Sequence, residues 1–227
     1  MCQGSIGKLV LYTISIMRQV ETNRSDQMHC SKDLYQKGSC FHFYNRVVDG
    51  EFLFIDHHDY LTFLSKFRNS MERYPLSVFA YCLMPNHFHF FIRQNSEIAI
   101  YQIFNSVLSS YVQKYNLKYQ RRGALMGGPL QSIEIADDQY VLNLCSYIHL
   151  NPVKAKMVLT AKEWEYSNYS EWIGIKNGKS FDPSVFELYN ITMQKYKQRI
   201  ENYQDEVESD KFKRLLFDNE REINSNT

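Results

Sequence analysis

The sequence lacks long apolar runs, paired cysteines and a strong net charge of either sign. No segment reaches the roughly 18 consecutive apolar residues of a membrane-spanning helix, so we expect no transmembrane segment. The five cysteines are scattered and include no C-x-x-C pair, which argues against a disulfide framework and against a thiolate zinc site. We therefore expect a soluble protein of the reducing cytoplasm.

The N-terminal stretch KLVLYTISIM, residues 8–17, has the apolar character of a signal-peptide core. The residues that follow it, RQVETNRSD, contain no small-x-small cleavage site. Secretion is therefore not expected, in agreement with a cytoplasmic protein.

The formal net charge of +1 gives no general sign of a nucleic-acid binder, but the charges are unevenly distributed. Acidic residues outnumber basic ones over residues 201–227, so the rest of the chain is mildly basic. In residues 113–122, QKYNLKYQRR, cations are interleaved with tyrosines, which suits a phosphate backbone with bases stacked nearby. A solvated helix end explains the same composition equally well. The four cations are Lys114, Lys118, Arg121 and Arg122.

The first part of the chain predicts a strand followed by a helix. Residues 40–48, CFHFYNRVV, are aromatic and β-branched and predict a strand. Asp49 and Gly50 then indicate a turn, which leads into a short extended piece. Apolar residues at helical spacing predict a helix over residues 56–73.

The middle of the chain predicts a β-hairpin and a second helix. Residues 75–84, PLSVFAYCLM, indicate a strand, and the break at residues 85–86 leads into the returning strand HFHFFIR, residues 87–93. An apolar stripe predicts a helix over residues 97–119.

A short strand and a third helix follow. Residues 130–135, LQSIEI, predict the strand. We expect Asp137 to cap the third helix, and we expect residues 151–152, Asn-Pro, to end it, because the residue before a proline disfavours the α conformation.

Helices interspersed with hairpin-linked strands predict an α+β fold, with an antiparallel sheet of the ferredoxin-like kind packed with helices. We expect three parts. Residues 1–37 form an N-terminal extension, residues 38–175 form the main domain, and residues 176–227 form a helical C-terminal appendage with an acidic tail.

Two histidines lie in the returning strand of the hairpin. Side chains alternate between the faces of a strand, so His87 and His89 share one face, while Phe88, Phe90 and Ile92 share the other. We expect the three apolar side chains to face the core. The imidazoles are then close enough to bind one divalent ion. Surface or structural histidines are the alternative.

A tyrosine and an asparagine lie four residues apart near the end of the third helix. Tyr147 and Asn151 therefore share one helix face. A phenolic oxygen can attack phosphorus and form a covalent intermediate, and an amide oxygen can bind a metal ion or accept a hydrogen bond.

YCLMPNHFHFFI, residues 81–92, followed about fifty residues later by YIHLNPVKA, residues 147–155, resembles a known family. The two segments are similar to the single-tyrosine HUH transposases of the insertion-sequence-200 type, in particular the REP-associated tyrosine transposases. The resemblance extends over residues 41–172.

The resemblance implies an HUH/Rep-type catalytic domain over residues 38–175. In it, His87 and His89 bind Mg²⁺ or Mn²⁺, Tyr147 is the nucleophile, and Asn151 takes the position of a third metal ligand. The implied substrate is single-stranded hairpin DNA of repetitive palindromic elements, which is nicked and rejoined through a 5′-phosphotyrosine intermediate.

The alternative is a domesticated protein of the same fold that binds structured DNA or RNA without cutting it. A monomer and a homodimer both remain open. A zinc hydrolase that uses the two histidines is disfavoured, because no acidic third ligand occurs at a recognisable spacing.

Further polar residues accompany the two segments. Arg46 and Arg93 are candidate phosphate contacts, with solvated strand-end charges as the alternative. We interpret His149 as structural or DNA-facing rather than catalytic. For His42 we expect an ordinary strand-face histidine, which could approach the site only if its strand lies next to the strand of His87 and His89.

Overall fold

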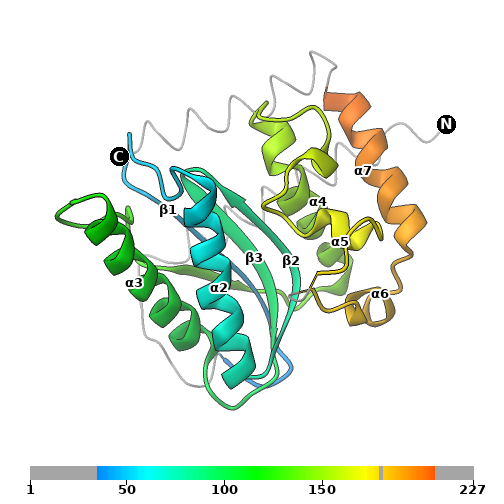
Figure 1. The fold of residues 1–227 in the computed structure, drawn as a ribbon. Coiled ribbons are helices and arrows are strands. Elements are labelled where there is room, and N and C mark those ends of the chain that lie inside the picture. The colour runs from blue at the N-terminus through cyan, green and yellow to red at the C-terminus, as the bar shows by residue number, and fades with distance from the viewer. Residues whose placement is uncertain (1–34, 179–180, 208–227) are drawn as a thin grey trace, which may run out of the picture.

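A computed structural model describes residues 35–178 and 181–207 of the chain (Figure 1). Most of the expected N-terminal extension and the end of the acidic tail lie outside the described residues. Within them, no helix is both long and apolar enough to cross a membrane.

The sheet has four strands in the order β2-β3-β1-β4, and every neighbouring pair is antiparallel. The strands are β1 (Cys40–Arg46), β2 (Leu76–Met84), β3 (His87–Gln94) and β4 (Gln131–Glu134). Helix α2 (His57–Arg73) connects β1 to β2, and helix α3 (Ile100–Lys118) connects β3 to β4. This order is that of a ferredoxin-like sheet, so the predicted fold class is confirmed.

Helices α2 and α3 cover one face of the sheet (Figure 1). Asp56 caps α2 in a capping box with Asp59, which fixes where the helix begins. The core on this side is largely aromatic, with Phe63, Phe88 and Phe90 fully buried. The predicted orientation of the apolar residues of the hairpin is therefore confirmed.

A second core covers the histidine face of the sheet. Helix α4 (Asp138–Lys154) packs across it, and Phe91, Leu144 and Ile148 are fully buried there. Four shorter elements surround α4, and Figure 1 shows α5 and α7 on this side. They are η1 (Ala161–Glu163), α5 (Tyr169–Trp172), α6 (Ser184–Leu188) and α7 (Met193–Val207).

The predicted end of the third helix was wrong, because α4 continues through Pro152 to Lys154. Proline lacks one backbone donor and restricts the residue before it. Here the loss falls in the last turn, where Ala155 N–H still donates to Asn151 O and Met157 N–H to Pro152 O. The consequence is that Asn151 remains helical and stays on the face of α4 that carries Tyr147.

Candidate active site

The histidine pair lies at the start of β3, beside the end of β1. Tyr44 pairs with His89 across the two strands, and Arg46 pairs with His87. His89 is buried, and His87 is half-buried. The imidazole rings are 5.2 Å apart between centroids. Both therefore point to the space between the sheet and α4.

His87 lies between two amide oxygens. Its Nδ1 is 2.7 Å from Asn86 Oδ1, and its Nε2 is 3.4 Å from Asn151 Oδ1. Burial lowers the pKa of His87 to about 4, so the ring is neutral at pH 7 and has a single N–H. The shorter contact places that proton on Nδ1. The Nε2 lone pair and the Asn151 oxygen then face each other as two acceptors.

Two acceptors that face each other fit a cation between them. The Asn151 side chain is held in this orientation because its Nδ2 donates to Tyr147 O at 3.0 Å. Together with His89, the donor set is two imidazoles and one amide oxygen, which suits a divalent ion such as Mn²⁺. Within residues 35–178 and 181–207, no group of three or more His, Cys, Asp or Glu side chains is arranged to hold a metal ion. Such a site would therefore depend on the neutral Asn151.

Tyr147 reaches the same space from α4. Its ring makes an edge contact with His89, with 5.2 Å between ring centroids. The Lys154 ammonium lies 4.5 Å from the centre of the Tyr147 ring, and burial lowers the pKa of this lysine to about 8. Tyr147, Asn151 and Lys154 follow one another at spacings of four and three residues, so they share one helix face. The structure therefore brings together the four predicted catalytic and metal-binding residues.

His42 is part of this site, although the sequence indicated only a structural role. Its Nε2 lies 3.0 Å from His89 Nδ1, and its ring contacts the rings of both His89 and Tyr44. The pairing of β1 with β3 brings these residues together. His42 and Tyr44 share one face of β1. The sequence could assign them to this site only if the pairing of β1 with β3 were known.

His149 is structural. It is fully buried, its Nε2 is 2.9 Å from Asn168 Oδ1, and its Nδ1 is 2.6 Å from Tyr196 Oη. Asn168 Oδ1 also accepts from Tyr81 N–H, so it is an acceptor and His149 Nε2 carries the proton. His149 thus connects α4 to α7 and, through Asn168, to β2.

The two strand arginines differ in position. Arg46 is exposed and lies directly opposite His87. Arg93 is six residues further along β3, at the end away from the histidine pair, where its Nε donates to Gly38 O at 3.3 Å. Only Arg46 is therefore placed for a substrate held at the histidines.

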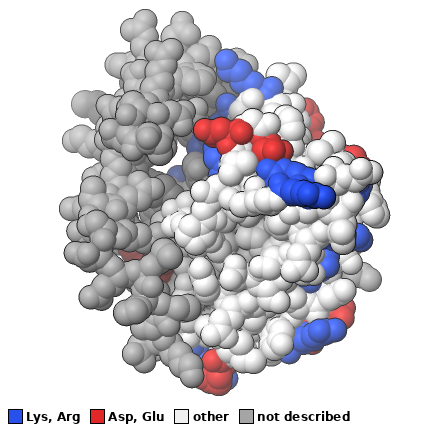
Figure 2. Space-filling view, turned by 90° about the vertical axis from the view of Figure 1, so that its left-hand side faces the viewer, with Lys and Arg blue, Asp and Glu red and all other residues white. Residues whose placement is uncertain are grey.

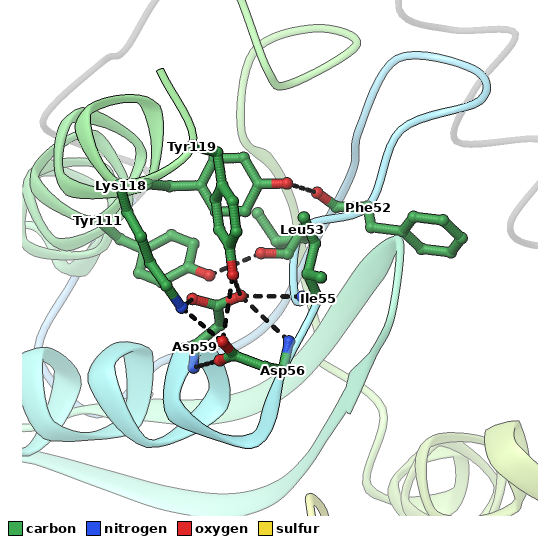
Figure 3. Close-up of polar contacts among 9 residues, drawn as sticks. Phe52, Leu53, Ile55, Asp56, Asp59, Tyr111, Lys118 and Tyr119 are labelled. Atoms are coloured by element: carbon green, nitrogen blue, oxygen red, sulfur yellow. Dashed lines mark hydrogen bonds and ion pairs between the residues drawn. The ribbon is translucent and has the colours of Figure 1, made fainter. Parts of the chain in front are cut away.

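Two of the four cations in residues 113–122 form intramolecular ion pairs. Lys118 Nζ lies 2.7 Å from both Asp56 Oδ2 and Asp59 Oδ1, and Arg121 pairs with Glu51 at 2.9 Å. Figure 3 shows Lys118 and Tyr119 converging on the two aspartates. Lys118 thus holds the end of α3 against the start of α2, and Arg121 binds the connection between β1 and α2, so their availability to a phosphate backbone is reduced.

Lys114 and Arg122 are exposed. Figure 2 shows the α3 side of the molecule, where most of the surface of the described residues is neither Lys or Arg nor Asp or Glu, and the charged groups lie toward its edges. The exposed positions in the middle of α3 agree with this view, since they are the uncharged Asn105, Ser106, Ser109 and Ser110. The structure therefore shows no broad basic surface along the described part of α3, and the DNA contacts remain a prediction.

Comparisons with known proteins agree with this geometry. Residues 39–150 match the family model described as "Transposase IS200 like". A Haemophilus influenzae protein with the provisional name REP-associated tyrosine transposase is 29% identical over 123 residues, covering 49% of this chain and 69% of the relative.

A solved REP-associated tyrosine transposase bound to a REP hairpin has a similar fold. The TM-score is 0.53 at 14% identity, and the match covers 70% of this chain and 97% of that one. At this identity the match supports the fold alone. Together with the family match, it confirms the resemblance predicted from the sequence: residues 39–150 of this chain are similar to the transposase domains of the IS200-like family.

Proposed function

We propose that this protein nicks and rejoins single-stranded DNA at hairpin-forming repeats, with Tyr147 as the nucleophile. The observation that carries the proposal is the meeting of Tyr147 and Asn151 with His87 and His89 in one chain, from elements more than fifty residues apart. The hairpin-bound relative supports a DNA hairpin as the partner.

The reaction is a transesterification at phosphorus. The Tyr147 oxygen loses its proton and forms a bond to the scissile phosphorus, while the bond from phosphorus to the 3′ oxygen breaks and that oxygen takes up a proton. The products are a 5′-phosphotyrosine and a free 3′-hydroxyl. Because one phosphoester bond replaces another, a 3′-hydroxyl can reverse the step and rejoin the strands without an external energy source.

Each residue of the site has a role in this reaction. His87, His89 and Asn151 would hold Mg²⁺ or Mn²⁺, which supplies positive charge to the scissile phosphate when it is bound. The contact with His89 orients the Tyr147 ring toward the same space, and Lys154 places a positive charge beside that ring. Arg46, at the edge of the site, is placed to bind a flanking phosphate.

The test is incubation of the purified protein with a fluorescent single-stranded hairpin and Mn²⁺, followed by denaturing electrophoresis. We expect a covalent protein–DNA adduct that Tyr147→Phe abolishes. Tyr140→Phe is the matched control, since Tyr140 lies on the same helix two turns earlier, and it should still form the adduct. An adduct that persists in Tyr147→Phe would refute the assignment of the nucleophile.

A non-cleaving protein that binds structured DNA or RNA is distinguished by the same experiment. Tight hairpin binding by the wild type, without any adduct in Mg²⁺ or Mn²⁺, would support that alternative.

A further inference from the structure

A third histidine contacts the predicted metal-binding pair from the neighbouring strand. His42 Nε2 and His89 Nδ1 are 3.0 Å apart, and the two rings stack at 5.2 Å between centroids. His42 is 1% exposed. Two ring nitrogens at this distance are joined by one proton, which one ring donates to the other.

That proton has two possible positions, and each fixes the other nitrogens. If His42 Nε2 donates, His89 Nδ1 is an acceptor and His89 carries its proton on Nε2, which then cannot bind a cation. If His89 Nδ1 donates, His89 Nε2 keeps its lone pair. Only the second arrangement prepares His89 for the role that it has in the proposed function.

We propose that His42 is a positioning residue that accepts the Nδ1 proton of His89 and so keeps the lone pair of His89 Nε2 available in the site. The inference rests on the proposed function for the use of that lone pair. His87 shows the same arrangement, since its Nδ1 faces Asn86 Oδ1 at 2.7 Å and its Nε2 faces Asn151. Metal-binding histidines commonly donate their second N–H to such a fixed partner.

The second ring nitrogen of His42, Nδ1, distinguishes the proposed positioning role from a purely structural role. His42 Nδ1 is buried and has no hydrogen-bond partner among the described residues. In the proposed arrangement this atom is an N–H, and a buried donor without a partner is unfavourable. A purely structural pair would take the opposite arrangement, in which only a lone pair is unpartnered. The position of the proton therefore distinguishes the two roles.

The first test is NMR of the metal-free, full-length protein with ¹⁵N-labelled histidine, without DNA. Long-range proton–nitrogen correlations report which ring nitrogen of each histidine carries hydrogen. We expect the proton of His89 on Nδ1 in the wild type and a shift toward Nε2 in His42→Phe. A wild-type His89 protonated on Nε2 would overturn the proposal.

The second test is Mn²⁺ binding measured by calorimetry. His42→Phe keeps an aromatic ring but cannot accept a proton, so we expect about 10- to 100-fold weaker binding. His42→Gln offers an amide oxygen as acceptor and should recover most of the loss. Equal Mn²⁺ affinity of the wild type and a folded His42→Phe variant would overturn the proposal.

The controls keep this inference separate from the proposed function. His58→Phe changes an exposed histidine of α2 and should leave both the Mn²⁺ affinity and the His89 spectrum unchanged. If the wild type forms no DNA adduct, the proposed function fails, but the proton position of His89 still tests the role of His42.

Discussion

The ammonium group of Lys154 lies 4.5 Å from the centre of the Tyr147 ring, two turns further along the same helix. A cation over an aromatic face is attractive, and the attraction increases as the ring acquires negative charge. The structure therefore places a positive charge beside the group that would lose a proton during attack. Because burial lowers the pKa of Lys154 to about 8, that charge is present at pH 7 and is lost as the pH rises above 8.

Replacement of Lys154 should slow adduct formation in a pH-dependent way. We expect Lys154→Met to reduce the rate about 5- to 10-fold at pH 7, on the scale of a cation–π contact. The rate advantage of the wild type over Lys154→Met should decrease between pH 7 and 9.5. Lys154→Arg should keep its advantage over the same range, because arginine stays charged. A constant advantage of the wild type across this range would contradict the prediction.

Mn²⁺ binding should survive replacement of Asn151 by aspartate, which keeps an oxygen ligand, but not by alanine. In Asn151→Ala the oxygen that faces His87 Nε2 is lost, so we expect clearly weaker Mn²⁺ binding in calorimetry. Asn151→Asp keeps an oxygen and adds a negative charge, so its affinity should equal or exceed that of the wild type. Asn105→Ala, at an exposed position of α3, is the control. Unchanged Mn²⁺ binding in Asn151→Ala would remove this residue from the proposed ligand set.

Buried His149 should make folding sensitive to acid. Burial lowers its pKa to about 4, so between this value and its unfolded pKa of about 6.5 the unfolded chain binds more protons than the folded one. Stability is therefore lost as the pH falls through this window. The expected share of His149 in the loss between pH 7 and 5 is about 2 kcal/mol.

The measurement is urea unfolding of the wild type and His149→Gln at both pH values. The variant should be less stable at pH 7, because Gln cannot bond both Tyr196 and Asn168, but its loss on acidification should be smaller. The other buried histidines contribute equally to both proteins and cancel in the comparison. Identical losses in the two proteins would contradict the assigned role.

The aspartate at the start of α2 should be a stability determinant. Asp59 is 3% exposed, and its carboxylate accepts from Ile55 N–H, Lys118 and Tyr119 Oη at 2.7–2.9 Å (Figure 3). Its removal leaves several donors without an acceptor, so Asp59→Ala should cost about 3 kcal/mol in urea unfolding. Lys114→Ala, which changes an exposed cation of α3, is the control and should change the stability by less than about 0.5 kcal/mol.

The fold class was predictable from the order of the elements. Alternation along residues 87–93 placed His87 and His89 on one face, and helical spacing placed Tyr147 with Asn151. That the two pairs belong to one candidate site was implied by the resemblance, not by a local signal. The role of His42 depends on which strands pair, and the ion pairs of Lys118 and Arg121 depend on how α3 meets α2. Neither arrangement leaves a signal within a short segment. The end of α4 was missed because a proline in the last turn removes little hydrogen bonding.

The hydrogen bond between His149 and Tyr196 connects α7 to α4, the helix that carries Tyr147. The helix that carries Tyr147 meets the histidine pair with one side, and its other side is held by α7 through this buried contact. A chain shortened before residue 193 would keep every residue proposed to act on the scissile phosphate. It would lose the contact that supports α4 behind Tyr147, so we expect truncation of α7 to reduce the rate of adduct formation more than the affinity for DNA.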